Sequence, residues 1–337
     1  MPLGEGEYWY KMKDYTGLMT FAEQRESRIH PVSYELLGKG REIADKLGVE
    51  LSSVLLGNQM EEAAKELIYY GADKVFLYDH PVLEEFDLLN YKHNIVKLVR
   101  EVKPEIFLLG ATRLGRSLGP RVSVALDTGL TADCIGLDVD ENGNLIQIRP
   151  AFTGSILAQI KTATRPQMST IRYKVMQKKA RDPNRRGEVI KKDAELVPSL
   201  LTIISKERTD EANIAEADVI VSGGRGLKKA EDFRILADLA ELLGGVVGSS
   251  RPLVDDGWIG REHQVGFSGN TVKPKIYVAC GISGSSQHLA GMRMSDVIVA
   301  INSDPSAPIF KVADYGIVGD LYEVVPTLIN RIRERRS

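Results

Sequence analysis

The chain of 337 residues contains only two cysteines, Cys134 and Cys280, which are far apart and form no CxxC pair. The chain alone therefore supplies neither an iron–sulfur cluster nor a zinc knuckle. Two buried thiols in a reducing compartment are the simpler expectation. No segment has the ~18 consecutive apolar residues that a membrane span requires. Residues 1–16 mix acids and bases without an apolar core, so neither a signal peptide nor a transit peptide is expected.

The chain also has no large excess of positive or negative charge. The formal net charge is -2, and lysines and arginines are scattered among acids, which argues against a nucleic-acid surface. Apolar residues make up 43% of the chain, enough for a buried core, and the length favours two domains. We therefore expect a soluble, cytoplasmic protein without nucleic-acid partners.

The first half alternates short apolar strands with longer amphipathic helices, which predicts a parallel sheet with right-handed crossovers. The expected strands are residues 17–22, 51–56, 74–78 and 106–109, and the expected helices are residues 32–47, 61–70 and 88–102. This half is predicted to be one doubly wound α/β domain.

The pattern changes after residue 131. Residues 134–139, 145–149, 156–162 and 167–174 predict mostly antiparallel strands at the edge of the first sheet, with Asn142-Gly143 as a hairpin turn. Residues 176–196 predict an exposed loop, and residues 201–205 predict a last strand. A polar stretch then precedes a new apolar pattern, which places the domains at residues 1–208 and 209–337.

The second half starts again as an open, mostly parallel α/β sheet. Strands are expected at residues 219–221 and 246–247, with a helix at residues 230–243 between them. Residues 276–302 predict strand, turn, short helix and strand. The turn is rich in glycine and serine and lies where a parallel strand meets a helix, which is typical of a phosphate-facing wall of a nucleotide or flavin site.

Several catalytic motifs are absent. The segment that starts at Gly224 has Lys229 where the dinucleotide fingerprint has its third glycine, so we expect only a tight turn with Arg225 facing a ligand. The segment from Gly281 fails as a nucleophile elbow because Ser285 stands at the fifth position. No phosphate-binding loop and no HExxH motif is present, which disfavours hydrolase, kinase and metalloenzyme functions.

Five segments at successive strand ends carry groups that can contact a ligand. One such group is more often an ordinary cap or turn, but five on one sheet edge favour a nucleotide cradle. The segments begin at Ser249, Gln264, Ser283, Asn302 and Asp320.

Motifs in this half match a known family. The sequences SGGRGL, GSSRPLVDDGW, QVGFSG, GISGSSQHLAGM, VAINSDPSAPIFKVADYGIVGDL and VVP resemble the FAD-binding domain of electron transfer flavoprotein alpha subunits. The sequences AEQRE, SYELLGKGREIADKLG, GATRLGRSLGPRVSVALDTGLTADC and RPAF are similar to the N-terminal domain of that family. The resemblance covers nearly the whole chain. It implies a heterodimer with a beta subunit, FAD in this chain, AMP or a second FAD in the beta subunit, and docking between the N-terminal domains.

The resemblance also implies roles for individual residues. Arg225 and Ser250 are expected at the phosphate and ribityl region, and Arg251 beside the flavin ring. The ring is expected to be lined by Val265, Gly266, Phe267 and Ser268. The pyrophosphate and the pyrimidine side of the flavin are expected to contact Ser283, Gly284, Ser285, Ser286, Gln287 and His288. The adenosine is expected to contact Asn302, Asp320 and Leu321. No catalytic residue and no metal ligand is expected.

Two positions depart from the common family loop VGQTG, because Phe267 replaces glutamine and Ser268 replaces threonine. A serine hydroxyl still reaches flavin N5, so we expect binding to persist. A unit charge about 4 Å away contributes on the order of 4 kcal/mol at an effective dielectric of ~20, so Arg251 is expected to tune the flavin potential. The alternatives are an ion pair of Arg251 with Asp255 or Asp256, and a capping or core role for His288.

We interpret the protein as an electron carrier between a donor dehydrogenase or NADH-linked flavin and an acceptor oxidoreductase, rather than an enzyme with its own organic substrate. A further hypothesis, based on Ser268, Met292 and Met294, is membership in an electron-bifurcating complex. The alternative class is a nucleotide-binding structural or regulatory subunit without redox traffic. A stand-alone dehydrogenase is disfavoured because no acid/base pair accompanies the flavin loop. The N-terminal aromatic group, Tyr8 with Trp9 and Tyr10, is either a subunit contact or a tail packed on its own domain.

Overall fold

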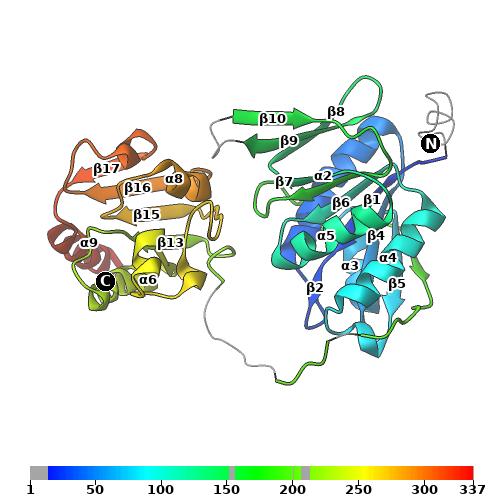
Figure 1. Cartoon of the computed structure of the whole chain (residues 1–337), viewed down its shortest axis with the longest axis horizontal. Helices are drawn as coiled ribbons and strands as arrows, with labels where there is room; N and C mark the ends of the chain where they lie inside the picture. The colour runs from blue at the N-terminus through cyan, green and yellow to red at the C-terminus, as the bar shows by residue number, and fades with distance from the viewer. Residues whose placement is uncertain (1–13, 152–155, 200, 206–212, 337) are drawn as a thin grey trace. The chain divides into compact units, whose positions relative to one another are not determined.

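The computed structural model describes residues 14–151, 156–199, 201–205 and 213–336. The chain divides into two compact units, Met1–Ser205 and Lys206–Ser337, coloured from blue to green and from yellow-green to red in Figure 1. The aromatic group of Tyr8, Trp9 and Tyr10 lies outside the described residues.

A seven-stranded sheet forms the centre of unit 1, in the order β12-β5-β4-β1-β6-β11-β7, and every neighbouring pair is parallel. This confirms the predicted parallel sheet. Its strands are β1 (Leu18–Ala22), β4 (Leu51–Gly57), β5 (Lys74–Asp79), β6 (Ile106–Gly110), β7 (Leu130–Cys134), β11 (Gln167–Ile171) and β12 (Glu188–Lys191). A small hairpin, β2 (Gln24–Arg25) and β3 (Arg28–Ile29), follows β1.

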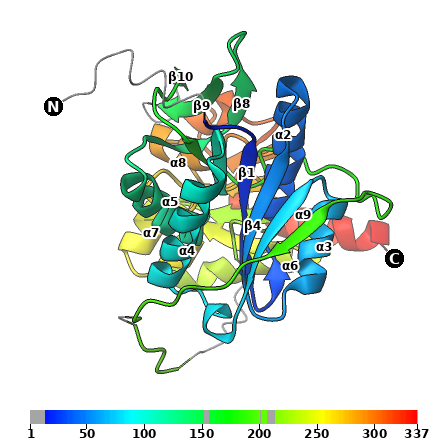
Figure 2. The ribbon, with the colours of Figure 1, turned by 90° about the vertical axis from the view of Figure 1, so that its right-hand side faces the viewer.

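Helices cover both faces of this sheet, as Figure 2 shows. Successive residues of β1 point to opposite faces, because Leu18 joins the core under α2 and α3 whereas Met19 joins the core under α4 and α5. The unit is therefore doubly wound, as predicted. The helices are α2 (Pro31–Leu47), α3 (Glu61–Tyr69), α4 (Leu88–Val102) and α5 (Arg113–Ala125), with a 3-10 turn at Pro81–Leu83.

The prediction for the segment after residue 131 was partly wrong. Three strands, β8 (Gly136–Val139), β9 (Leu145–Ala151) and β10 (Ile156–Ile160), form the expected antiparallel sheet. However, β11 lies inside the main sheet, parallel to both β6 and β7. Two hydroxyl residues make the sequence of β11 partly polar, which argued against an inner strand. Both are buried with hydrogen-bond partners: Ser169 donates to Gln147 Oε1 at 2.7 Å, and Thr170 accepts from the Asp133 amide at 3.0 Å.

Two further expectations between residues 176 and 205 were wrong. The expected loop contains β12, a short strand that pairs with β5. Its charged ends, Glu188 and Lys191, are exposed at the edge of the sheet, which is why its sequence is polar. Residues 201–205 are not a strand, although their sequence favours one.

Unit 2 contains a five-stranded sheet in the order β14-β13-β15-β16-β17, with all neighbouring strands parallel. This confirms the second predicted α/β sheet. The strands are β13 (Val219–Gly223), β14 (Val246–Ser249), β15 (Ile276–Cys280), β16 (Val297–Asn302) and β17 (Tyr315–Val318). The helices are α6 (Phe233–Leu243), α7 (Arg251–Asp255), α8 (Ser286–Met292) and α9 (Leu321–Arg336), with 3-10 turns at Ala230–Asp232, Arg261–His263 and Pro308–Lys311.

The strand order defines where a ligand can enter unit 2. The chain runs from β13 outward to β14 and then returns to place β15 on the other side of β13. The connections after β13 and β15 therefore diverge, because α6 packs on one face of the sheet and α8 on the other. In open α/β sheets the crevice at such a point, beyond the carboxyl ends of the strands, is the usual ligand site.

Candidate flavin site

The turns after β13 and β15 pack backbone against backbone. The Gly224 amide donates to the Cys280 carbonyl at 3.0 Å, and the Gly226 amide donates to the Gly281 carbonyl at 3.0 Å. A Cβ atom on Gly226 would lie 2.6 Å from Gly281 Cα, so a side chain would force the turns apart. The glycines thus bring two strand ends close together and leave backbone, rather than side chains, at the centre of the crevice.

The loop of residues 264–269 is fixed between β14 and α8. The Val265 amide donates to the Ser249 carbonyl at 2.8 Å, and the Phe267 amide donates to the Gln287 carbonyl at 2.8 Å. Gly291 in α8 has no room for a side chain because the Gly266 backbone occupies that space. The structure therefore brings the segments of Arg251, Ser268 and His288 together on adjacent elements.

The residues expected to contact the cofactor separate into an exposed rim and a buried floor. The exposed ones are Arg225, Arg251, Phe267, Ser268, Ser283, Ser285, Ser286, Gln287 and Asp320. The buried ones are Ser250, Val265, Gly266, Gly284, His288 and Leu321. The exposed side chains are polar except that of Phe267, which is 68% exposed although it is apolar.

Arg251 forms an ion pair with Asp255, one of the two alternatives that the sequence allowed. Its Nε lies 3.1 Å from Oδ2 of Asp255, one helical turn later, and both side chains are more than half exposed. An exposed pair of this kind contributes little to stability, so the guanidinium is available to a stronger partner.

Ser268 is oriented by the side chain of Gln264, a role that the sequence pattern did not indicate. Gln264 Nε2 donates to Ser268 Oγ at 3.0 Å, and Gln264 itself is buried. Because the serine oxygen accepts this bond, its own hydrogen points away and is free to donate to a ligand.

His288 is a buried histidine on α8, and only 5% of its surface is exposed. Its Nε2 lies 3.0 Å from the hydroxyl of Tyr277 on β15, whereas its buried Nδ1 has no hydrogen-bond partner among the described residues. Burial lowers the pKa of His288 to about 4, an effect that the neighbouring Val265 backbone partly offsets. The imidazole is therefore neutral at pH 7, so His288 acts as a hydrogen-bonding group rather than as a charge.

The residues expected at the adenosine have local structural contacts. Asn302 donates from Nδ2 to the Ile282 carbonyl and accepts the Asp304 amide at Oδ1, both at 2.9 Å. Asp320 accepts the Tyr322 amide at 2.9 Å, and Leu321 packs in the core. These contacts shape the rim at the ends of β16 and β17, and the contact with adenosine stays a prediction.

The residues present fit a flavin dinucleotide on structural grounds. The glycine turns allow close approach of a pyrophosphate, and the exposed Arg225 and Arg251 supply positive charge at the same rim. Met292, by contrast, is fully buried in the core and faces no rim, which removes one motive for the bifurcation hypothesis.

Comparison with family models agrees with both units. The model described as "Electron transfer flavoprotein domain" matches residues 18–197, and the model described as "Electron transfer flavoprotein FAD-binding domain" matches residues 213–293. The fold and these matches define a flavoprotein that carries electrons and binds FAD through unit 2.

Curated relatives narrow this class. The electron transfer flavoprotein subunit alpha of Thermoanaerobacterium thermosaccharolyticum is 52% identical over 328 residues, which cover 96% of this chain and 99% of the relative. The subunit of the same name from Megasphaera elsdenii is 47% identical over 335 residues, covering 97% and 99%. The lactate dehydrogenase (NAD(+),ferredoxin) subunit LctC of Acetobacterium woodii is 45% identical over 324 residues, covering 94% and 77%. The chain belongs to the electron transfer flavoprotein alpha subunit family.

Other candidate features lie outside this rim. Both cysteines are buried, and burial raises the pKa of each thiol to about 12, which makes them unreactive. Among the described residues no group of His, Cys, Asp or Glu could hold a metal ion. A search of the same residues finds no helix that is long and apolar enough to cross a membrane.

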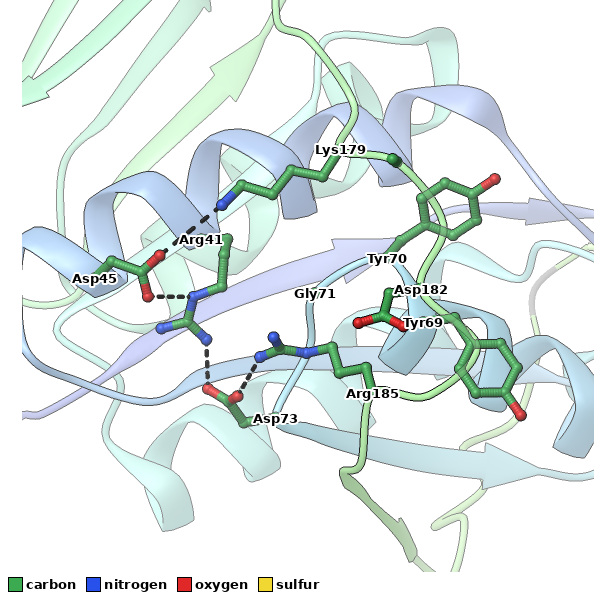
Figure 3. Close-up of a pocket in the computed structure, with 10 residues that line it drawn as sticks. Arg41, Asp45, Tyr69, Tyr70, Gly71, Asp73, Lys179, Asp182 and Arg185 are labelled. Carbon is green, nitrogen blue, oxygen red and sulfur yellow. Dashed lines mark hydrogen bonds and ion pairs between the residues drawn. The ribbon is translucent and has the colours of Figure 1, made fainter.

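Unit 1 contains a polar pocket of about 410 Å³ at the start of β5, shown in Figure 3. Asp73 lies at its base and accepts from Arg41 Nη1 and from Arg185 Nη2, each at 2.6 Å. Arg41 also pairs with Asp45 at 2.7 Å. Both arginines are thus already matched by carboxylates, and the cluster fastens the segment around Arg185 to the body of unit 1.

Proposed function

We propose that FAD binds at the carboxyl edge of the unit 2 sheet. In this arrangement Arg225, Ser250 and residues 283–286 hold the pyrophosphate and ribityl region, and Asn302, Asp320 and Leu321 the adenosine. The flavin ring lies against residues 265–268, with Arg251, Gln287 and His288 around its pyrimidine side. Bound FAD supplies one-electron and two-electron redox chemistry.

One observation carries this proposal. The turns after β13 and β15 meet backbone to backbone at Gly226 and Gly281, inside the segment that matches the FAD-binding domain model over residues 213–293. Backbone without side chains at the carboxyl ends of parallel strands lets a pyrophosphate approach closely. His288 lies beside the loop of Val265 and on the helix that follows the Gly284 turn, which are the segments expected at the flavin.

The test is a titration of the apoprotein, prepared with its partner subunit, with FAD. We expect His288→Ala to weaken binding at least about tenfold, which corresponds to roughly 1.4 kcal/mol. Arg251→Ala should make the bound flavin harder to reduce, because a nearby positive charge favours the reduced form. Arg234 is an exposed arginine on α6 and serves as the control. Unchanged affinity and potential in the His288 and Arg251 variants would contradict the proposed site.

The functional complex is proposed to be a heterodimer with an electron transfer flavoprotein beta subunit that holds AMP or a second FAD. The predicted N-terminal domain, residues 1–208, is proposed to dock on the N-terminal part of that subunit, and residues 209–337 to form the FAD-binding domain. Electrons would pass from a donor dehydrogenase to an acceptor oxidoreductase. Copurification of the two subunits in a 1:1 ratio tests the pairing.

A second, narrower function is favoured by one relative. The LctC subunit, at 45% identity, belongs to an enzyme whose name couples NAD(+) and ferredoxin. This supports the hypothesis that the present chain works in a complex that sends electrons from NADH to two acceptors. The number of FAD and AMP molecules in the purified heterodimer tests this hypothesis. One FAD and one AMP per heterodimer would exclude a second flavin in the beta subunit.

A further inference from the structure

Residues 201–205 form an exposed segment without regular secondary structure at the end of unit 1, seen in Figure 1 as the chain that leaves the body of that unit. The exposed fractions are 72% for Leu201, 58% for Ile203 and 95% for Ile204. From Leu196 to Ser205 the sequence LVPSLLTIIS carries no charged residue, and Glu195 and Lys206 flank it. An exposed apolar stretch with high β propensity is an aggregation hazard unless another surface covers it.

Most of the main chain of this segment has no partner among the described residues. Ser199 Oγ donates to the Leu201 carbonyl at 3.1 Å and accepts the Leu201 amide at 3.2 Å. Thr202, Ile203, Ile204 and Ser205 make no backbone hydrogen bond with any other described residue. Their sequence favours a strand, but no described strand pairs with them. Another sheet edge would supply the missing main-chain partners.

The segment leaves unit 1 from a specific anchor on α4. Asn94 donates to the Glu195 carbonyl and accepts the Glu195 amide, both at 2.9 Å. Asn90 does the same for Val197, at 3.1 and 2.8 Å. Residues four apart on a helix share one face, and residues two apart on a strand share one edge. The two asparagines thus act as a substitute strand edge that holds the chain extended just before Pro198.

We infer that residues 201–205 add as a β-strand to an exposed sheet edge of the partner subunit. This inference rests on the proposed heterodimer. A membrane surface is the less suitable partner for two reasons. It supplies no main-chain groups to pair with the free amides and carbonyls, and the uncharged sequence is not attracted to charged lipid headgroups. In a strand the side chains of Leu201 and Ile203 point to one face and that of Ile204 to the other. The predicted strand therefore carries apolar side chains on both faces and would be buried on both.

Hydrogen exchange in the purified heterodimer tests this inference directly. We expect the amides of residues 202–205 to exchange at least about a hundredfold more slowly than in an unstructured peptide, because strand pairing protects them. Exchange at the unstructured rate would overturn the inference. Equal protection in the isolated alpha chain would assign the pairing to this chain itself, and protection in an alpha homodimer would assign it to a second copy. Either result also overturns it.

Substitutions separate strand pairing from simple apolar contact. An edge strand directs alternate amides toward its neighbour, so proline at successive positions 202, 203 and 204 should weaken subunit association in an alternating pattern. Uniform effects of the three prolines would contradict strand pairing. Ile203→Asp should weaken association about a hundredfold, whereas Val82→Asp, at a 47% exposed position on unit 1, should not. If a 1:1 complex with FAD forms but residues 202–205 exchange freely, this inference fails while the proposed function stands. If no complex forms with any beta subunit, both fail.

Discussion

The hydroxyl of Tyr277 lies 3.0 Å from Nε2 of His288, and both side chains are buried in unit 2. Burial raises the pKa of Tyr277 and lowers the pKa of His288, so both side chains are uncharged at pH 7. A neutral phenol and a neutral imidazole share one hydrogen between them, and this bond joins β15 to α8. The tyrosine thus holds the histidine in place beside the loop of Val265.

Replacing Tyr277 with phenylalanine should remove this link between β15 and α8. The variant leaves Nε2 buried without its hydrogen-bond partner, a cost of about 1 to 3 kcal/mol, and we expect weaker FAD binding together with lower stability of unit 2. Fluorescence titration with FAD and thermal unfolding of the apoprotein measure the two effects. Tyr315→Phe is the matched control because Tyr315 is 65% exposed. Equal FAD affinity in Y277F and the wild type would show that the hydroxyl plays no part in binding.

The pH dependence of stability should reveal the same histidine. Its pKa is lowered to about 4 in the folded protein, against about 6.5 for an ordinary histidine, so between these pH values only the unfolded chain binds the proton. Stability contributed by the neutral ring is therefore present above pH 6.5 and is lost as the pH falls toward 4. The slope approaches about 1.4 kcal/mol per pH unit in that window.

Urea unfolding of the apoprotein between pH 7.5 and 5 provides the measurement. We expect the wild type to lose stability more steeply than His288→Gln over this range, because glutamine does not titrate. Parallel curves for the two proteins would mean that the buried histidine is not the source of the pH dependence.

The packing of Gly266 against Gly291 makes α8 sensitive to a single methyl group. Alanine is the better helix former by about 1 kcal/mol, so Gly291→Ala would stabilise an isolated helix. Here the added carbon meets the Gly266 backbone, and we expect lower stability and weaker FAD binding because the loop must move. Gly257→Ala is the control, since a Cβ atom there meets nothing within 4 Å and adds only the strain of a positive φ. Stability equal to that control would show that the loop adjusts without cost.

The sequence predicted the regular parts of both units and misjudged the polar ones. The helix at Leu88–Val102 and the strand, turn, helix and strand around α8 follow from apolar periodicity and were predicted correctly. The inner position of β11 was missed because its hydroxyl residues find partners only in the folded unit, Ser169 at Gln147 on β9 and Thr170 at the Asp133 amide on β7. No local signal connects Tyr277 to His288, because only the crossover from β15 to α8 brings them together. Contacts set by tertiary packing are not encoded in a short sequence window.

The last prediction concerns Asp73, which joins two arginines from distant parts of unit 1 (Figure 3). Burial opposes its ionisation, but the Leu51 amide and the two guanidinium groups outweigh this effect and lower the pKa of Asp73. A carboxyl group with a lowered pKa contributes stability above its unfolded pKa, and this contribution is lost as the pH falls through the folded value. Asp73→Asn leaves Arg185 without its ion pair and weakens the hold on the segment that leads to β12. We expect a loss of roughly 1 to 3 kcal/mol and faster hydrogen exchange in residues 188–191, with Asp193→Asn as a control. Unchanged exchange in β12 would show that strand pairing with β5 alone holds this edge of the sheet.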